Sequence, residues 1–120
     1  MAVDLSYARN LAITQGRFFG VRFYLSQETY QIEDVNGQVI THPVTKHAYQ
    51  VEFAGDSRFS RVDIVQASFD GTSLIRFDYQ GCPYNGSGNP LNKGMVTLTA
   101  DSETRFVTIE PVTGVISVQP

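Results

Sequence analysis

Cysteine, tryptophan and long apolar runs are rare or missing in this sequence of 120 residues. Cys82 is the only cysteine, which excludes both an intrachain disulfide and a multi-cysteine metal site. There is no Trp. No apolar stretch approaches the roughly 20 residues that a membrane-spanning helix needs, and no secretory signal peptide is recognisable.

Positive charge is also scarce. Nine Lys and Arg residues stand against 12 Asp and Glu residues, for a formal net charge of −3. Residues 114–120 contain neither Lys nor Arg. Nucleic acid and anionic lipid are recognised chiefly through concentrated positive charge, so neither is an expected partner.

What the chain does have is enough apolar material for a core. Hydrophobic residues make up 42% of it, and eight Phe and six Tyr are spread along its length. This length and composition are typical of one packed domain. We therefore expect a single globular domain over residues 1–120.

The first regular pattern predicts a short helix over residues 4–16. Asp4 lies where an N-cap residue would lie, and Gly16 where a helix ends. Apolar and small side chains recur between them at steps of three and four, the spacing of one helix face. The residues of this face are Leu5, Ala8, Leu11, Ala12 and Gln15.

An isolated helix of this length is marginal in water, so something must cover its apolar face. After Gly16 the pattern changes to a period of two, which is typical of a strand. We expect Leu5, Ala8 and Ala12 to pack on the strand residues Val21 and Phe23.

Alternating patterns predict about eight short strands. In the strand 73–79, Tyr79 is expected to point inward together with Ile75 and Phe77. The strand 60–68 is apolar on both faces, which predicts cover on two sides, with Val65 and Ala67 sharing one face. The expected strands span 18–25, 28–34, 49–53, 60–68, 73–79, 95–100, 104–110 and 115–118.

Turn signals separate these strands. Asn36-Gly37 and Asp70-Gly71 are two-residue hairpin signals, because these residues accept positive φ. Residues 38–41 are expected to flank the first hairpin turn. Residues 81–93 are polar and broken by Gly and Pro, so we expect a long loop without regular structure there.

A helix followed only by strands, joined by tight turns, favours the α+β class. We expect one N-terminal α-helix packed on antiparallel β-sheets that form a sandwich-like β domain.

Three segments, in this order and spacing, resemble the minor pseudopilins of the GspH/FimT family. Residues 8–17 are similar to the end of the family's long helix, with its Ala-Arg-x-x-Ala-Ile segment. Residues 75–81 are similar to its apolar-x-Phe-x-x-x-Gly strand, and residues 105–118 to its terminal hairpin. The sequence departs from the family pattern in having no Trp in the aromatic strand and Val115 where an Arg commonly stands.

The resemblance implies a subunit that is not an enzyme. Members are prepilin-peptidase substrates that assemble into the pseudopilus of type II secretion or into a type IV pilus. The expected partners are other pilin or pseudopilin subunits and secreted cargo. A hydrophobic membrane helix is expected ahead of Val3 in the full-length protein, anchoring it in the bacterial inner membrane with the globular domain in the periplasm.

Few residues offer chemistry. His42 and His47, with Glu52 or Asp56, have donor atoms that zinc accepts, but no further His or Cys pair completes a closed site. Cys82 needs a base to act as a nucleophile, and the histidines belong to a distant segment. We interpret these side chains as loop histidines and a structural thiol.

Other patterns have simple structural explanations. The glycine-rich residues 86–90 lack the Lys-Ser/Thr and the helix of a phosphate loop. The carboxylates of Glu33-Asp34 and of Asp101 with Glu103 could bind calcium, but turns favour them for backbone reasons alone. Five aromatic residues could form a platform for sugar or single-stranded nucleic acid, or simply pack in the core: Phe18, Tyr24, Tyr30, Tyr79 and Tyr84.

Gly16 and Gly20 have the spacing of a membrane dimer motif, but no apolar helix surrounds them. We therefore expect no catalytic residue, no metal ligand and no cofactor. The alternative function is that of a free-standing β-sandwich module that binds a ligand through residues 81–93.

Overall fold

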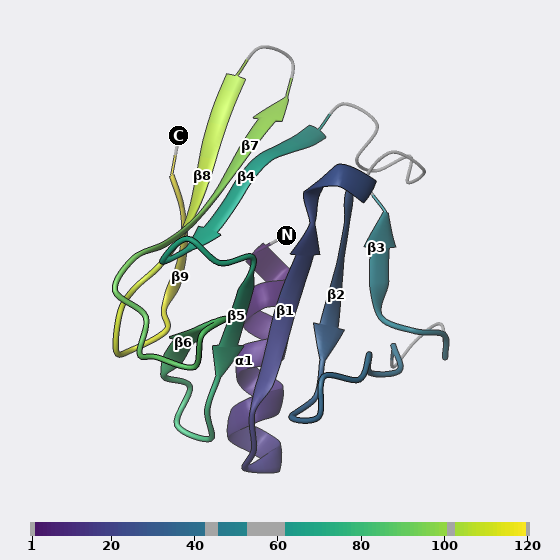
Figure 1. Ribbon diagram of the computed structural model, residues 1–120, viewed down its shortest axis with the longest axis vertical. Helices are drawn as coiled ribbons and strands as arrows, with labels where there is room; N and C mark the ends of the chain where they lie inside the picture. The colour runs from purple at the N-terminus through teal and green to yellow at the C-terminus, as the bar shows by residue number, and fades with distance from the viewer. Residues whose placement is uncertain (1, 43–45, 53–61, 101–102, 120) are drawn as a thin grey trace.

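The computed structural model describes residues 2–42, 46–52, 62–100 and 103–119 (Figure 1). One α-helix is followed by strands that form a five-stranded and a four-stranded antiparallel sheet, as expected for the α+β class. No helix in the described ranges is long and apolar enough to cross a membrane. The elements are α1 (Ala2–Gln15), β1 (Phe19–Tyr24), the 3-10 turn η1 (Leu25–Gln27), β2 (Thr29–Glu33), β3 (Gln50–Glu52), β4 (Val62–Phe69), β5 (Leu74–Phe77), β6 (Pro83–Asn85), β7 (Gly94–Ala100), β8 (Glu103–Ile109) and β9 (Ile116–Gln119).

Helix α1 ends where it was predicted to end but begins earlier. Gly16 has a φ of 67°, and the amides of Gly16 and Arg17 both donate to the carbonyl oxygen of Ala12, at 3.0 and 3.2 Å. This left-handed residue closes the helix, as glycine commonly does. The prediction that Asp4 is the N-cap is wrong, because the helix already includes Ala2 and Asp4 lies in its first turn.

The five-stranded sheet has the order β3-β2-β1-β5-β6. Its central strand β1 pairs on one side with β2, where Val21 faces Ile32, and on the other with β5, where Val21 faces Ile75. Figure 1 shows α1 behind β1 and β5, and the helix packs mainly on these two strands and on β9. Alternate side chains of β1, those of Phe19, Val21 and Phe23, are buried in the core that the sheet shares with the helix.

The four-stranded sheet has the order β4-β7-β8-β9. A bulge interrupts β4 between Ile64 and Gln66, so Val65 has no partner in β7. The bulge shifts the alternation: Val65 is 57% exposed, whereas Ala67 is buried. The prediction that Val65 and Ala67 share a covered face is therefore wrong, because an extra residue in one strand inverts the pattern that follows it.

Another strand prediction needs correction, and the residues expected to flank the first hairpin turn pair only weakly. Residues 38–41 make isolated bridges, from Val39 to Glu33 and from Thr41 to Ala48. The strand 73–79 stops at Phe77, and Tyr79 is 60% exposed instead of pointing inward. The chain turns at residues 78–81, where the amide of Gly81 donates to the carbonyl oxygen of Asp78 at 2.9 Å.

The chain turns at both predicted hairpin signals, but the two turns differ in conformation. Asp70 and Gly71 both have positive φ, of 54° and 85°, as a two-residue hairpin turn requires. The strands that they join, β4 and β5, diverge after one bridge and enter different sheets. At Asn36-Gly37 only Gly37 has positive φ, and its amide closes the turn on the carbonyl oxygen of Asp34 at 3.0 Å.

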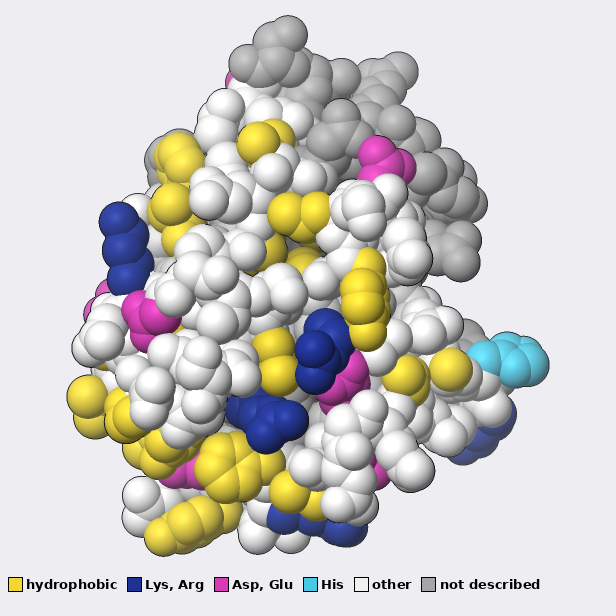
Figure 2. Space-filling view, viewed as in Figure 1, with side chains coloured by type: hydrophobic (Ala, Val, Ile, Leu, Met, Phe, Trp, Pro, Cys, Tyr) yellow, Lys and Arg dark blue, Asp and Glu magenta, His cyan; other side chains and the backbone are white. Residues whose placement is uncertain are grey.

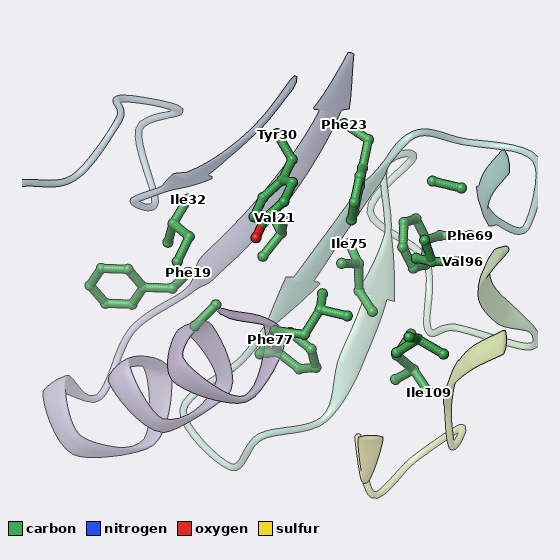
Figure 3. Packing of buried hydrophobic residues seen from close by; sticks show 14 of the residues in the cluster. Phe19, Val21, Phe23, Tyr30, Ile32, Phe69, Ile75, Phe77, Val96 and Ile109 are labelled. Atoms are coloured by element: carbon green, nitrogen blue, oxygen red, sulfur yellow. The ribbon is translucent and has the colours of Figure 1, made fainter. Parts of the chain in front are cut away.

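The helix and both sheets share one core. Leu5, Ala8 and Ala12 of α1 are fully buried in the cluster that contains Val21 and Phe23, which confirms the predicted packing. The rest of the predicted helix face is less covered, since Leu11 is half-buried and Gln15 exposed. Figure 3 shows side chains of the four-stranded sheet beside those of the five-stranded one: Phe69, Val96 and Ile109 lie next to Ile75.

Candidate assembly interface

The side of α1 that faces away from the sheets is uncharged. The helix contains only two charged residues, Asp4 and Arg9, and both make contacts within the domain. The outer side includes Val3, which is 78% exposed, Ile13, which is 41% exposed, and the exposed Asn10. Solvent-facing helix surfaces usually carry charged residues, so an uncharged face of this kind suits packing against another protein element.

Asp4 fixes the N-terminal part of α1 to the five-stranded sheet. Its two carboxylate oxygens accept hydrogen bonds from the hydroxyl groups of Tyr30 on β2 and of Tyr49, next to β3. The ring of Tyr7, one turn further along the helix, stacks on Tyr49 with ring centroids 5.6 Å apart. Hydrogen bonds to a carboxylate are stronger than neutral ones, so this contact anchors the helix firmly.

Arg9 connects the opposite flank of α1 to both sheets. Its Nη2 atom donates to the carbonyl oxygen of Thr113, in the β8–β9 turn, at 2.9 Å. Its Nε atom lies 3.0 Å from where a β-carbon on Gly81 would be, and 3.1 Å from the same point on Gly114. Both glycines have positive φ. The helix, the β5–β6 turn and the β8–β9 turn therefore meet at this arginine.

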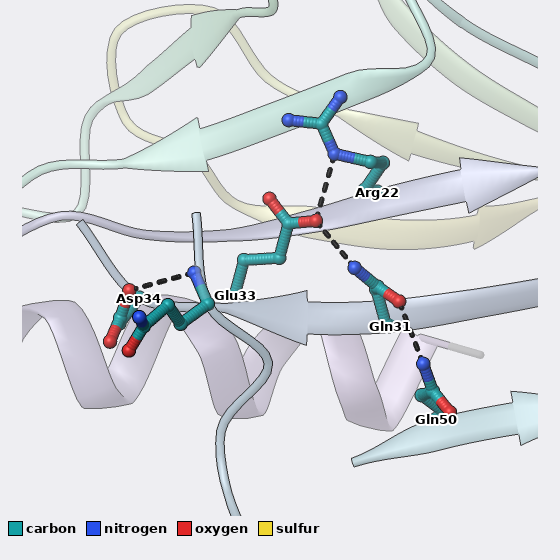
Figure 4. A network of polar contacts seen from close by, with 6 residues as sticks. Arg22, Gln31, Glu33, Asp34 and Gln50 are labelled. Carbon is teal, nitrogen blue, oxygen red and sulfur yellow. Dashed lines mark hydrogen bonds and ion pairs between the residues drawn. The ribbon is translucent and has the colours of Figure 1, made fainter. Parts of the chain in front are cut away.

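The outer face of the five-stranded sheet carries a polar network (Figure 4). Arg22 and Gln31 both donate to Oε2 of Glu33, at 2.8 and 2.6 Å, and Gln50 donates to Gln31 at 3.0 Å. The hydrogen bond to Glu33 is the main reason why the pKa of Arg22 is raised above its ordinary value. Oε2 of Glu33 is thus engaged by its own neighbours, whereas Oε1 is buried and accepts no hydrogen bond from the described residues.

The remaining carboxylates weighed for calcium are also engaged. One oxygen of Asp34 accepts hydrogen bonds from the amides of Asn36 and Gln38, at 2.9 and 3.0 Å. Glu103 forms an exposed ion pair with Arg105 at 2.9 Å. Asp101 lies outside the described residues.

The two histidines are joined through their backbones. The amide of His42 donates to the carbonyl oxygen of His47 at 2.7 Å, and the ring of His42 lies 4.5 Å from that of Tyr49. Within the described ranges, no three His, Cys, Asp or Glu side chains gather as a metal site would require. The side chain of Glu52 and all of Asp56 fall outside what the structure describes.

Cys82 is a half-buried thiol beside Asp78. Burial, and then the charge of Asp78, raise the pKa of this thiol above its ordinary value. A nucleophilic cysteine needs the opposite shift. Asp78 itself accepts hydrogen bonds from the amides of Gln80 and Cys82, both at 2.9 Å, so it closes a turn.

Residues 81–93 are more ordered than predicted. They contain strand β6, which pairs with β5, and Leu91 is only 3% exposed. The side chain of Asn85 accepts hydrogen bonds from the amides of Ser87 and Asn89 and donates to Asp70 at 3.0 Å. Side-chain bonds of this kind replace the regular ladder that the Gly and Pro residues prevent.

The five aromatic residues do not form one platform. Tyr30 is fully buried on the inner side of the five-stranded sheet. Phe18 and Tyr84 meet edge to face at 5.4 Å, while Tyr24 and Tyr79 are exposed separately. Hydrophobic side chains on the face shown in Figure 2 gather at the lower left, over the β5–β6 and β8–β9 turns.

Sequence reasoning missed the roles of several residues in this architecture. Asp4, Arg9, Asp78, Asn85 and Gly114 each form contacts with residues that are distant in sequence or close a turn. The one available signal was that Asp4 and Arg9 are the only charges on an otherwise uncharged helix, which hints that each has a specific partner.

Comparison with known proteins supports the fold. No protein-family model matches the sequence, and none of the curated proteins matches it. Among solved structures, the type IV minor pilin FimU of Pseudomonas aeruginosa matches in two crystal forms, both with a TM-score of 0.61, at 17% and 14% identity. These alignments cover 99% of this chain and 86% and 82% of the FimU chains.

The minor pseudopilin EpsH of the type 2 secretion system of Vibrio cholerae matches with a TM-score of 0.65 at 12% identity, covering 98% of this chain and 88% of that chain. The order of the helix and the strands thus agrees over almost the whole chain, although few residues are identical. This chain therefore has the α+β fold of the minor pilins and minor pseudopilins.

Proposed function

We propose that this chain is an assembly subunit, either a minor pseudopilin of a type II secretion system or a minor pilin of a type IV pilus. It acts through contacts with other protein subunits and not as an enzyme. The observation that carries this proposal is the uncharged outer side of α1, with Val3 and Ile13 exposed. The fold shared with FimU and EpsH supports it.

In this proposal the helix has two roles. Its inner side holds the domain together through Leu5, Ala8 and Ala12, with Asp4 and Arg9 as anchors on either flank. Its outer side packs against helices of neighbouring subunits. Because the anchors fix the helix relative to both sheets, the β domain is carried in one orientation on each subunit.

The same proposal assigns a location. The full-length protein is held in the bacterial inner membrane by an apolar segment of roughly 20 residues ahead of Val3, and the β domain lies in the periplasm. The gene sequence upstream of Val3 checks this directly. A cytosolic protein whose translation starts at Met1 contradicts the proposal.

A photo-cross-linking amino acid at Asn10 tests the interface in the full-length protein in its own host. Asn10 is exposed on the outer side of α1. We expect adducts with other pilin-like subunits. Gln66, exposed on β4, is the matched control position and should give none of these adducts. The proposal fails if Asn10 gives no such adduct, or if both positions give the same adducts.

The alternative of a free-standing module that binds a ligand through residues 81–93 gains no support from the structure. Leu91 is buried and the side chain of Asn85 is used within the segment. Both residues thus stabilise the segment itself.

A further inference from the structure

A groove of about 250 Å³ lies between α1 and the segment 34–41. Leu11 of the helix forms one wall, Ile40 the other, and the buried Phe19 contributes to the lining between them. Arg17 and Asp34 are the two charged residues among its described lining. In Figure 1 this is the place where the lower half of α1 runs beside the chain that follows β2.

The wall of the groove formed by residues 34–41 is fixed by backbone hydrogen bonds. The amide of Asp34 donates to the carbonyl oxygen of Gln38 at 2.8 Å. Ile40 donates to Ile32 at 3.0 Å and accepts from the amide of Tyr49 at 2.8 Å. These bonds hold the segment in place although it forms no regular strand. The groove therefore needs little rearrangement to accept a ligand, which lowers the cost of binding.

The two charged side chains that line the groove, Asp34 and Arg17, differ in how far neighbouring groups satisfy them. One oxygen of Asp34 already accepts two backbone hydrogen bonds, from Asn36 and Gln38. Among the residues that the structure describes, Arg17 donates to the amide oxygen of Gln15 alone, at 3.2 Å, and its guanidinium lies 6.0 Å from the centre of the Phe19 ring. Of the carboxylates that the structure describes, none pairs with Arg17. The groove thus has a mixed lining, in which Leu11 and Ile40 lie beside Arg17, a cation that forms no ion pair with a described carboxylate.

Its size indicates what kind of ligand fits. Sites for cofactors and drug-sized molecules usually enclose about 300–1,000 Å³. A shallower groove takes one or two side chains, which is how protein segments are anchored at interfaces. We propose that this groove binds a segment of another protein chain that inserts an apolar side chain between Leu11 and Ile40 and places an Asp or Glu carboxylate on Arg17.

This inference goes beyond the proposed function and does not depend on it. The groove lies beside the outer side of α1 and would bind an apolar-acidic protein segment, whereas the outer side of α1 would pack against helices of other subunits. A random peptide library displayed on phage and selected on the purified chain tests it. We expect enrichment of peptides in which an apolar residue lies close to Asp or Glu. Arg17→Glu should reverse the acidic preference to Lys or Arg, and should weaken binding of the original peptides at least about tenfold, since an attractive contact becomes a repulsive one.

Arg105→Glu is the matched control. Arg105 is an exposed arginine on β8, away from the groove, so this variant should keep the acidic preference. Because Arg17 and Arg105 are both exposed, neither change removes a core contact. Amide chemical shifts of the labelled protein should change at Leu11, Arg17 and Ile40 when an enriched peptide is added.

Three results would overturn the proposal. The first is a selection that enriches no apolar-acidic motif, and the second is a motif that Arg17→Glu leaves unchanged. The third is self-association of the peptide-free chain that shifts the same amides, which would make the occupant a second copy. The cross-linking at Asn10 is independent of all three, so the groove and the assembly interface can fail separately.

Discussion

The carbonyl oxygen of Gly81 lies 2.2 Å from the point that a β-carbon on Gly114 would occupy. The two residues belong to different turns, one between β5 and β6 and the other between β8 and β9. The two sheets therefore meet through a contact in which neither residue has a side chain, and Arg9 of the helix covers it.

The first prediction concerns this contact. Gly114→Ala should lower the free energy of unfolding by about 2–4 kcal/mol, because the methyl group collides with backbone and the φ of 71° is strained for alanine. Gly88→Ala is the matched control: its φ is 84°, but no atom lies within 4 Å of the new methyl group. It should cost only about 1 kcal/mol. Urea denaturation measures both, and equal losses would mean that the turns can separate without cost.

The second prediction concerns the buried face of α1. Ala12→Asp places a carboxylate in the core and should lower the free energy of unfolding by more than about 3 kcal/mol. Asn10→Asp, on the exposed side of the same helix, should change it by less than about 0.5 kcal/mol. Thermal melting of the two variants distinguishes the faces. A similar melting temperature for both would contradict the packing of the helix on the sheets.

The third prediction concerns Asp4. Asp4→Asn removes the charged acceptor of the Tyr30 and Tyr49 hydroxyl groups and should lower the free energy of unfolding by about 1.5–3 kcal/mol. Glu110→Gln, a neutralisation of an exposed carboxylate, serves as the control. A double-mutant cycle of Asp4→Asn with Tyr49→Phe measures the coupling directly. A coupling energy of zero would show that the two side chains act independently.

The fourth prediction is a pH dependence at Asp70. Hydrogen bonds from the amide of Asn92 and the side chain of Asn85 are the main reasons why the pKa of Asp70 is lowered. A carboxyl group whose pKa is lower in the folded than in the unfolded state stabilises the fold above its unfolded pKa of about 3.9, and this stabilisation disappears as the pH falls through the folded pKa.

Asp70→Asn should therefore be less stable than the parent chain at pH 7, and the difference should shrink below about pH 4. Asparagine also tolerates the φ of 54° at this position, so backbone strain should not contribute to the difference in stability between the two chains. Denaturation series at pH 7, 4 and 3 give the comparison. A difference that does not change with pH would rule out the ionised carboxylate as its cause.

The parts of the fold that depend on local periodicity could be predicted from the sequence. The inner face of α1 and the alternation along β1 follow from steps of three to four and of two, because one buried side imposes such a pattern. Gly16 marked the helix end correctly, since its left-handed conformation has a local cause.

The parts that depend on distant partners could not be predicted. The bulge at Val65 shifts the apolar alternation, which runs through Val62 and Ile64 and then through Ala67 and Phe69. This shift is recognised as a bulge only when β7 is in place beside β4. The contact between Asp4 and Tyr49 joins residues far apart in the sequence, and the small size of Gly114 is required by a different turn altogether. The groove at Arg17 has the same origin, because its second wall comes from an irregular segment.

The two sheets alternate along the chain, since β4 enters the four-stranded sheet before β5 returns to pair with β1. A polypeptide synthesised from its N-terminus therefore cannot complete its first sheet until Leu74–Phe77 and Pro83–Asn85 have been made. Until then, one edge of β1 has no strand paired to it. Such long-range closure makes folding slow relative to a helical bundle. During that interval the unfinished chain is exposed to proteases and to pairing with other chains.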